Sequence, residues 1–429
     1  MKKNVLWASA VLFALTAVGC GRRETPAPPP PASRVKSGAQ VLIDSKAALV
    51  QGKRVGVVTN HSALLSDGTH LLDKLRTIPG VTIAALFGPE HGFQGTAYDG
   101  APVGHGMDEK SSTQIYSLYG ETNKPTPEML AGIDLLLFDI QDVGVRFYTY
   151  TSTMFLCLEA AAEQKIPFIV LDRPNPITGL KVEGPILEPA QKSFVGLFPL
   201  PVAHGMTIGE LAGLVNGEGW LAGGVKADLQ VVKMEGWTRD LWFEECGIPW
   251  VKPSPSMLHP GTAVVYPGTC FLEGTNVSEG RGTENPFAMI GAPYIDGDKL
   301  ASAMNAQGLT GIEFQPLSFF PISIPGVVAN PKYEYTSCGG VFLRVSDRNA
   351  FLPVRTGLAL LSTLKKLYPK EFEWRSPSRS TGKYYIDLLT GTPKIRELVD
   401  SGAGPAELAA AVDAGLADFM AVRQKYLLY

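Results

Sequence analysis

Short apolar runs alternate with helix-like segments through the first half of the sequence. The runs that predict strands are residues 54–59, 81–87, 115–120, 134–140, 167–171 and 227–232. The segments that predict helices are residues 71–75, 125–131, 152–164 and 207–215. Most of the runs are apolar throughout, as in strands that are covered on both faces. Strand, helix and strand repeating at this spacing predict an α/β fold with a mostly parallel sheet and helices on both faces.

The second half of the chain shows the same mixture of patterns. Residues 339–345 predict a strand, and residues 355–368 and 405–424 predict amphipathic helices. We therefore expect two domains: a first α/β domain over residues 39–262, and a second, smaller α/β domain over residues 263–429.

The first residues indicate export. Residues 5–18 are almost wholly apolar but too short to be a stable membrane span, and residues 17–20 (AVGC) resemble a lipoprotein box. We predict a lipoprotein signal peptide over residues 1–20, with lipid attached to Cys20, and a proline-rich tether over residues 21–38. The alternative is an ordinary cleaved signal with an incidental cysteine. The expected location is the periplasmic side or the cell surface, with the outer membrane favoured because no acidic residue directly follows Cys20.

Composition excludes several classes of function. The 429 residues are 45% hydrophobic and 18% charged, which is typical of a globular protein with a large core. A net charge of -3 gives no support for nucleic-acid binding. The chain has no GxGxxG or Walker A motif, and the cysteines after Cys20 have no zinc-binding spacing, so we expect neither a cofactor nor a metal.

Polar residues follow each clear strand at its carboxyl end. They are Asn60, His61, Glu90, His91, Gln141, Asp142, Asp172, Arg173, Asn175 and His204. The carboxyl ends of parallel strands meet at one edge of a sheet, so these side chains are expected to lie together. Any one of them can instead cap a helix or hydrogen-bond within a loop. Glu90 stands out because it lies in a glycine-rich turn, where Gly92 and Gly95 let the backbone turn tightly.

A second glycine-rich segment spans residues 266–282. It contains Glu273, Asn276, Glu279 and Arg281, whose side chains are suited to hydrogen-bonding sugar hydroxyls. The alternative is a glycine-rich connection with solvated charges.

Four long strings resemble one protein family. They are residues 88–93 (GPEHGF), 138–150 (FDIQDVGVRFYTY), 171–176 (LDRPNP) and 273–282 (EGTNVSEGRG). They resemble the YbbC/NamZ-like family, and the likeness runs from about residue 41 to the end of the chain. The resemblance implies an exo-β-N-acetylmuramidase that releases N-acetylmuramic acid from the non-reducing ends of peptidoglycan fragments during cell-wall recycling. It also implies a Rossmann-like domain, a smaller second domain, and an active site in the cleft between them.

The chemistry of glycoside hydrolysis suggests roles for the carboxyl groups. The reaction usually needs a carboxylic acid to protonate the leaving oxygen, and a second group for water or covalent attack. The family's catalytic acid maps to Glu90, which we take as the general acid. Asp142 and Asp172 are candidate bases on neighbouring strand ends, and Glu273 or Glu279 can reach in from the second domain.

The substrate's own carboxylate suggests further contacts. N-acetylmuramic acid carries a lactyl carboxylate, and Arg146, Arg173 and Arg281 are candidates to bind it, because an arginine fork matches a carboxylate. Tyr148 is suited to stacking on a sugar ring, although it is as well suited to the core. The other predicted substrate contacts are Asn60, His61, His91, Gln141, Asn175, His204 and Asn276.

Two other classes of function remain open at this stage. A non-catalytic lipoprotein that binds the cell wall would suit the tether and the polar groups equally well. A metal-dependent hydrolase would use His61, His91 and His204 with Asp142, although their spacing matches no common zinc motif.

Overall fold

The computed structural model describes residues 35–379 and 381–429. The predicted signal peptide, Cys20 and most of the predicted tether lie outside the described residues. Within the described ranges, no helix has the length and apolar character needed to cross a membrane.

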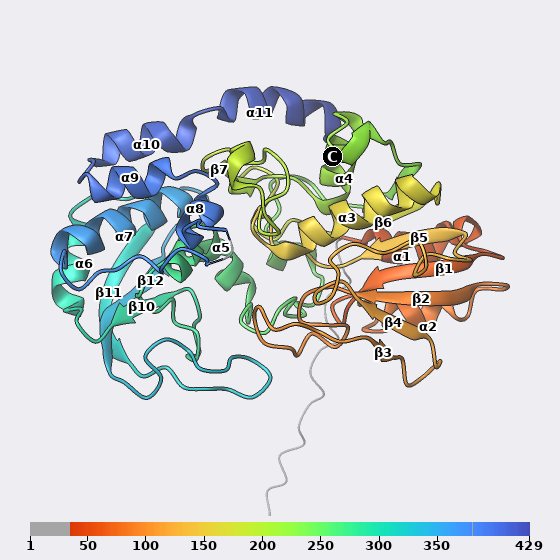
Figure 1. Ribbon diagram of the computed structural model, residues 1–429, viewed down its shortest axis with the longest axis horizontal. Coiled ribbons are helices and arrows are strands. Elements are labelled where there is room, and N and C mark those ends of the chain that lie inside the picture. The colour runs from red at the N-terminus through yellow and green to blue at the C-terminus, as the bar shows by residue number, and fades with distance from the viewer. Residues whose placement is uncertain (1–34, 380) are drawn as a thin grey trace, which may run out of the picture. The chain divides into compact units, whose positions relative to one another are not determined.

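The first half of the chain is built on a seven-stranded sheet with the order β3-β4-β2-β1-β5-β6-β9 (Figure 1). Its strands are β1 (Arg54–Thr59), β2 (Thr82–Gly88), β3 (Gly106–Met107), β4 (Gln114–Ser117), β5 (Leu135–Asp139), β6 (Phe168–Leu171) and β9 (Leu229–Val232). All neighbouring strands are parallel except β3 and β4. The predicted mostly parallel sheet is thereby confirmed.

Helices cover both faces of this sheet. They are α1 (Gly38–Ser45) and α2 (Leu71–Leu75) on one face, and α3 (Thr149–Gln164) and α4 (Ile208–Gly217) on the other. Successive strand residues point to opposite faces. Leu137 therefore packs in the cluster with α1 and α2, while its neighbour Phe138 packs in the cluster with α3 and α4. This double burial explains why the strands are apolar throughout.

The second half of the chain contains an antiparallel three-stranded sheet with the order β10-β12-β11. Its strands are β10 (Met289–Ala292), β11 (Ile312–Phe319) and β12 (Cys338–Val345). The helix α6 (Gly297–Asn305) packs on this sheet, α7 (Pro353–Leu367) packs on α6, and α5 (Pro260–Thr269) packs on α7. The short strands β7 (Val182–Glu183) and β8 (Ala203–His204) form a separate pair. A smaller α/β part therefore follows the first sheet, as predicted.

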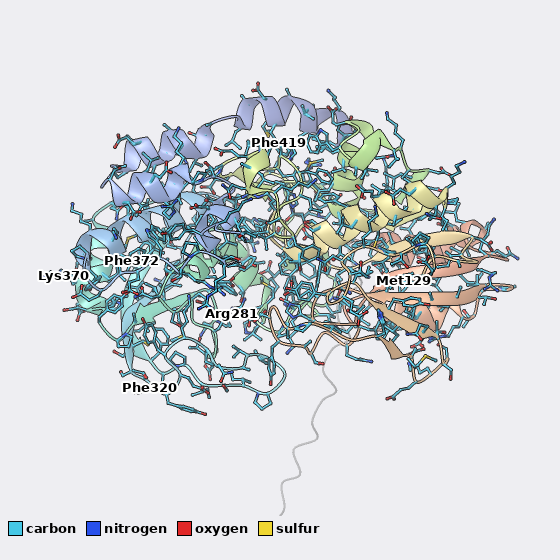
Figure 2. The ribbon with its side chains drawn as sticks, in the orientation of Figure 1. Met129, Arg281, Phe320, Lys370, Phe372 and Phe419 are labelled. Atoms are coloured by element: carbon cyan, nitrogen blue, oxygen red, sulfur yellow. The ribbon has the colours of Figure 1, made fainter. Side chains whose placement is uncertain are left out.

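The final helices return the chain to the first half. They are α8 (Tyr385–Thr390), α9 (Lys394–Asp400), α10 (Pro405–Asp413) and α11 (Leu416–Arg423). Phe372 and Phe419, labelled in Figure 2, belong to the hydrophobic core that runs through both halves. Beyond α11, the Tyr426 hydroxyl donates to Glu218 at 2.7 Å, just after α4.

Two predicted helices differ from the observed ones. Residues 127–131 form turns rather than a helix, and residues 125–126 have no regular structure, because a proline disfavours the helical conformation of the residue before it, as Pro127 does for Thr126. The predicted helix over residues 405–424 is two helices, α10 and α11, because Gly415 adopts a left-handed φ of 79° between them.

Candidate active site

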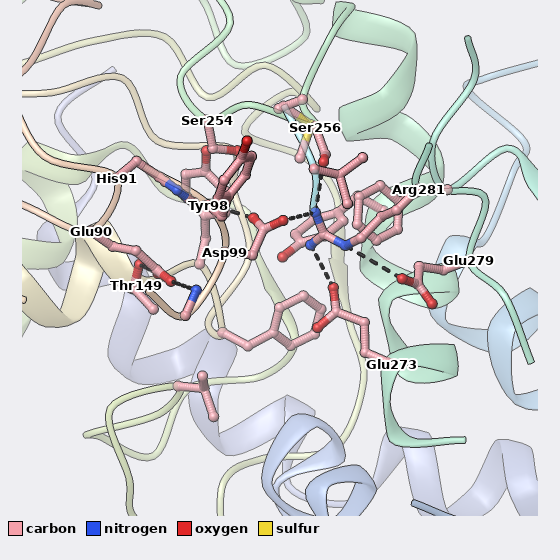
Figure 3. A pocket seen from close by; sticks show the side chains of 18 of the residues that line it. Glu90, His91, Tyr98, Asp99, Thr149, Ser254, Ser256, Glu273, Glu279 and Arg281 are labelled. Carbon is pink, nitrogen blue, oxygen red and sulfur yellow. Dashed lines mark hydrogen bonds and ion pairs between the residues drawn. The ribbon is translucent and has the colours of Figure 1, made fainter. Parts of the chain in front are cut away.

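A cavity of about 560 Å³ lies at the end of β2, with walls from both halves of the chain (Figure 3). Its polar and charged lining includes Glu90, His91, Asp99, Thr149, Ser254, Ser256, Glu273, Glu279, Arg281, Lys332 and Arg375. Aromatic side chains line it too, among them Tyr98, Tyr119, Tyr148, Tyr266, Phe287 and Tyr385. This mixture of hydrogen-bonding groups and aromatic faces suits a sugar.

Glu90 is held in a fixed orientation at this cavity. The strand β2 ends at Gly88, and the turn that follows leaves Glu90 buried, with 9% of its surface exposed. One carboxylate oxygen, Oε1, accepts a hydrogen bond from the Gly100 N–H at 2.9 Å. The other, Oε2, accepts from the hydroxyl of Thr149, the first residue of α3, at 2.6 Å. A loop and a helix end thus position both oxygens.

Strained backbone occurs at three non-glycine residues of the cavity wall. His91, Phe287 and Asn330 have φ values of 67°, 66° and 50°. Such conformations cost of order 1–3 kcal/mol each and are concentrated at ligand sites. The His91 ring is fixed as well, because Nδ1 lies 2.8 Å from the Ala97 carbonyl, to which it donates. The strain supports this cavity as a functional site.

Arg281 joins carboxylates from both halves of the chain. Its guanidinium donates to Asp99 in the first half, and to Glu273 at 2.8 Å in the second. It also bonds the Ser256 hydroxyl at 2.7 Å, and Nε lies 3.4 Å from Glu279 (Figure 3). Although burial opposes it, these carboxylates raise the pKa of Arg281 well above its ordinary value. Arg281 is therefore a permanent cation at the centre of an acidic cluster.

The two glutamates beside Arg281 differ in proton affinity. Burial raises the pKa of Glu273 above its ordinary value, against the opposing attraction of Arg281. Burial also acts to raise the pKa of Glu279, but Lys332 and Arg281 outweigh it and lower that pKa. The Lys332 Nζ lies 2.9 Å from Glu279. Glu273 therefore binds a proton more readily than Glu279 does.

Six of the residues predicted from the sequence line this cavity. They are Glu90, His91, Tyr148, Glu273, Glu279 and Arg281. Tyr148 forms part of the aromatic wall, with its ring edge-to-face on Tyr150 at a centroid distance of 4.9 Å. The other predicted residues lie away from the cavity lining, and each has a contact that explains its position.

Asp142 and His204 lie next to one another in the core. Asp142 Oδ2 accepts from the Gly144 N–H at 2.7 Å, and His204 Nε2 lies 3.7 Å from the same oxygen. Gln141 donates to the Pro174 carbonyl at 2.8 Å. These side chains hold together the loops that follow β5 and β6, and none of them lines the cavity.

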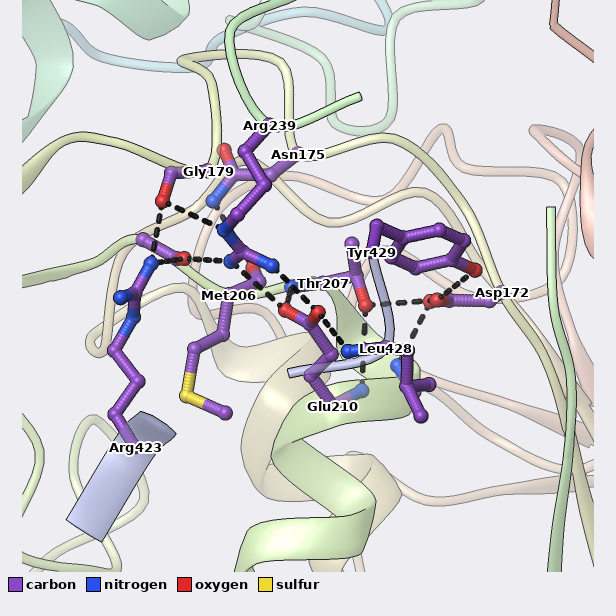
Figure 4. A network of polar contacts seen from close by, with 12 residues as sticks. Asp172, Asn175, Gly179, Met206, Thr207, Glu210, Arg239, Arg423, Leu428 and Tyr429 are labelled. Atoms are coloured by element: carbon purple, nitrogen blue, oxygen red, sulfur yellow. Dashed lines mark hydrogen bonds and ion pairs between the residues drawn. The ribbon is translucent and has the colours of Figure 1, made fainter. Parts of the chain in front are cut away.

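Asp172 holds the C-terminal end of the chain in place (Figure 4). This fully buried side chain accepts hydrogen bonds from the Thr207 hydroxyl at 2.7 Å, the Gly209 N–H at 2.8 Å and the Tyr429 hydroxyl at 2.8 Å. Burial raises its pKa to about 6. Nearby, Asn175 donates to the Met206 carbonyl at 3.0 Å. Both predicted residues act within the protein's own hydrogen-bond network.

Arg146 and Arg173 are both buried and occupied by protein partners. Arg146 donates to the backbone carbonyls of Pro185, Leu200 and Leu389 at 2.7–2.9 Å, and burial lowers its pKa to about 9. Arg173 forms a two-pronged pair with Asp139, with Nη2 2.9 Å from Oδ2. Arg146 thus links the second half of the chain to the first, and Arg173 links two strand ends.

Asn60, His61 and Asn276 also hold loops. Asn60 donates to the Tyr150 hydroxyl at 3.2 Å, behind the cavity wall. His61 contacts a backbone carbonyl at 2.8 Å and packs so closely on Gly95 that a Cβ there would lie 1.9 Å from its ring. Asn276 donates to another backbone carbonyl at 2.7 Å. The close packing of His61 explains why residue 95 is a glycine.

Among the described residues, no group of three or more histidine, cysteine or acidic side chains is placed to hold a metal ion. His61, His91 and His204 therefore do not form the metal site that the alternative hydrolase requires.

Several residues at the cavity were not anticipated from the sequence. They are Tyr98, Asp99, Gly100, Thr149, Arg375 and Tyr385. An Asp-Gly pair at residues 99 and 100 is a recognisable turn signal, and Thr149 lies within one of the family strings. No periodic pattern marks Arg375 or Tyr385, since both lie at the edge of a polar loop.

Comparison with known proteins gives consistent matches over most of the chain. The family model for the N-terminal domain of the exo-β-N-acetylmuramidase NamZ matches residues 55–261, and the model for its C-terminal domain matches residues 264–429. The peptidoglycan β-N-acetylmuramidase NamZ of Bacillus subtilis (strain 168) is 45% identical over 396 residues, covering 92% of each chain.

Two crystal structures of DUF1343 family proteins from Bacteroides fragilis NCTC 9343 resemble the fold. One is 36% identical with a TM-score of 0.84, covering 93% of this chain and 100% of that one. The other is 33% identical with a TM-score of 0.74, covering 92% of this chain and 99% of that one.

Proposed function

The chain belongs to the NamZ family of exo-β-N-acetylmuramidases, and from this premise we propose that Glu90 is the general acid of its glycoside hydrolase activity. The enzyme hydrolyses the bond after a terminal, non-reducing β-1,4-linked N-acetylmuramic acid in peptidoglycan fragments. The observation that carries the assignment of Glu90 is its fixed carboxyl group on the wall of a cavity lined by sugar-compatible side chains.

The contacts of Glu90 suit a group that must gain and lose a proton. The Gly100 N–H can only donate, so Oε1 is the oxygen that stays unprotonated. The Thr149 hydroxyl can donate to an ionised Oε2 or accept from a protonated one, so it tolerates both states. Oε2 is therefore the oxygen that carries the proton for the leaving sugar.

Glu273 is the proposed partner that activates water. It faces Arg281 in the second half of the chain, and burial raises its pKa. A carboxylate with a raised pKa accepts a proton more readily at neutral pH, as a general base requires. Glu279 is less suited to this role, because Lys332 and Arg281 stabilise its ionised form.

The choice of substrate tests the proposed exo-β-N-acetylmuramidase activity. We expect the wild-type enzyme to cleave 4-nitrophenyl β-N-acetylmuraminide, and to release N-acetylmuramic acid from a disaccharide that carries it at the non-reducing end. Mass spectrometry of the products measures both the bond cleaved and the sugar released. Binding of these sugars without any hydrolysis would instead support a non-catalytic cell-wall-binding protein, and cleavage of N-acetylglucosaminides alone would contradict the muramidase.

The proposed location rests on the sequence before the described residues. We propose that the protein is exported, that its signal is cleaved before Cys20, and that lipid on this cysteine anchors it to a membrane. Metabolic labelling with a radioactive fatty acid is expected to mark the wild-type chain but not Cys20→Ser. A mature N-terminus at any other residue, found by mass spectrometry, would contradict the anchor.

A further inference from the structure

The substrate requires a cation that the acidic cluster does not provide. N-acetylmuramic acid differs from N-acetylglucosamine by a lactyl ether that carries a carboxylate. Four carboxyl side chains line the cavity: Glu90, Asp99, Glu273 and Glu279. A substrate anion near these groups is repelled unless a cation pairs with it. Selection of this sugar therefore depends on a cation that the protein's own acids leave available.

Two cations of the cavity wall are already occupied. Lys332 Nζ donates to the carbonyls of Leu272 and Val277 and to Glu279, at 2.8–2.9 Å. These contacts use all three N–H donors of an ammonium group. Arg281 bonds Asp99, Glu273 and Ser256 and lies close to Glu279. Lys332 has no N–H left for a substrate carboxylate, and the charge of Arg281 is shared among three carboxylates of the protein.

Arg375 is the remaining cation on this wall. Its side chain is exposed, and among the described residues its guanidinium has no ion-pair or hydrogen-bond partner. Because water solvates it in the free enzyme, pairing with a substrate anion breaks no contact within the protein.

The position of Arg375 is nevertheless defined. Its backbone N–H donates to the Gly274 carbonyl at 2.8 Å, directly beside Glu273. Its guanidinium lies over the ring of Tyr385, 5.0 Å from the centroid, and Tyr385 also lines the cavity. An arginine stacked on an aromatic ring keeps its planar fork free to bind a carboxylate with two hydrogen bonds.

We propose that Arg375 binds the lactyl carboxylate of the terminal N-acetylmuramic acid and thereby sets the selectivity for this sugar over N-acetylglucosamine. This inference rests on the muramidase function proposed above. Tyr385 holds the guanidinium in place, and the exposure of Arg375 puts the lactyl group at the solvent-facing side of the cavity.

A comparison of charged and neutral substrates tests the contact. The substrates are 4-nitrophenyl β-N-acetylmuraminide and its lactyl methyl ester. We expect Arg375→Gln to lower kcat/KM on the acid by about 10- to 100-fold, mainly through KM, and to leave the ester nearly unchanged. Arg375→Lys is expected to fall between, since it keeps the charge but loses the fork. Arg344→Gln removes an exposed cation paired with Glu313 and serves as the matched control.

The possible results test the role of Arg375 separately from the muramidase function. If Arg375→Gln discriminates between acid and ester as the wild type does, Arg375 does not bind the lactyl group. If the wild type hydrolyses neither substrate, the muramidase function fails, and calorimetric binding of N-acetylmuramic acid then decides the role of Arg375. The contact is supported if Arg375→Gln binds N-acetylmuramic acid more weakly than the wild type does but binds N-acetylglucosamine with the same affinity. If the variant and the wild type have the same affinity for each of the two sugars, the proposal is overturned.

Discussion

Glu90→Gln is expected to lower kcat/KM about 10²- to 10⁴-fold on a disaccharide with N-acetylmuramic acid at its non-reducing end. Glutamine keeps the size of the side chain: its carbonyl oxygen can accept from the Gly100 N–H and its NH2 can donate to the Thr149 hydroxyl, but it has no acidic proton to give to the leaving sugar. Initial rates of sugar release, measured by mass spectrometry, give the loss. The exposed Glu121→Gln makes the same chemical change away from the cavity and should keep wild-type activity.

Substrates with different leaving groups distinguish a general acid from a general base. A 2,4-dinitrophenyl leaving group departs without protonation, so Glu90→Gln should lose less than about tenfold with this substrate, because acid catalysis is then dispensable. Glu273→Gln should lose activity on both substrates alike, since water still needs activation. Equal losses for Glu90→Gln on both substrates would remove Glu90 from the acid role.

The architecture of the first half could be predicted because each strand is covered on two faces. A run such as β5 stays apolar along its length, since its residues alternate between two helix layers. Errors arose where local chemistry rather than burial decides the backbone. Pro127 disfavours the helical conformation of Thr126, where the pattern suggested a helix, and Gly415 ends a helix that the pattern continued.

The candidate site was harder to predict than the fold, because polar residues at strand ends serve two purposes. Glu90 reaches the cavity, whereas Asp172, which directly follows another strand, holds the C-terminal Tyr429. Buried loops must satisfy their backbone and side-chain polar groups, and many strand-end residues do this. The sequence shows the residue type but not which of these partners the fold supplies.

Arg375 illustrates the same difficulty for charges. Arg146, Arg173 and Arg281 lie in recognisable strings, yet all three are occupied by protein carbonyls or carboxylates. Whether a cation is available for a substrate depends on how the acids are distributed around it, which is a property of the folded chain. Arg375 lies in a polar loop without periodicity, and only its place on the cavity wall distinguishes it.

Arg281→Met is expected to impair both stability and catalysis. It leaves Asp99, Glu273 and Glu279 facing one another without their shared cation. Removing one partner from a buried charge cluster costs about 3–5 kcal/mol. Because the Asp99 side chain is 32% exposed, we expect the lower half of that range for the free energy of unfolding measured in urea. The exposed pair of Arg344 and Glu313 provides the control, with an expected loss below about 1 kcal/mol in Arg344→Met.

The pH dependence of Arg281→Met distinguishes a charge effect from a loss of packing. Without the cation, the pKa of Glu273, which burial already raises, rises further, and Glu279 loses part of the attraction that lowers its pKa. Folded groups with raised pKa values stabilise the protein fully below the unfolded pKa, and that contribution is lost as pH rises through the folded pKa. The variant should therefore be close to wild-type stability near pH 4 and lose stability steadily toward pH 8. A deficit that is constant across this range would identify packing, not charge, as the contribution of Arg281.

The activity of Arg281→Met should also fall, because the substitution disturbs the position of Glu90. Arg281 holds Asp99, and the next residue, Gly100, donates its N–H to Glu90 Oε1. Releasing Asp99 frees this loop, so we expect kcat/KM to fall at least about 100-fold, as misplacement of a catalytic group by about 1 Å can do. Asp99→Asn keeps Arg281 and the neighbouring glutamates but weakens the same link, and should reproduce part of the kinetic loss with little loss of stability. Full activity in both variants would show that the link from Arg281 through Asp99 does not position the acid.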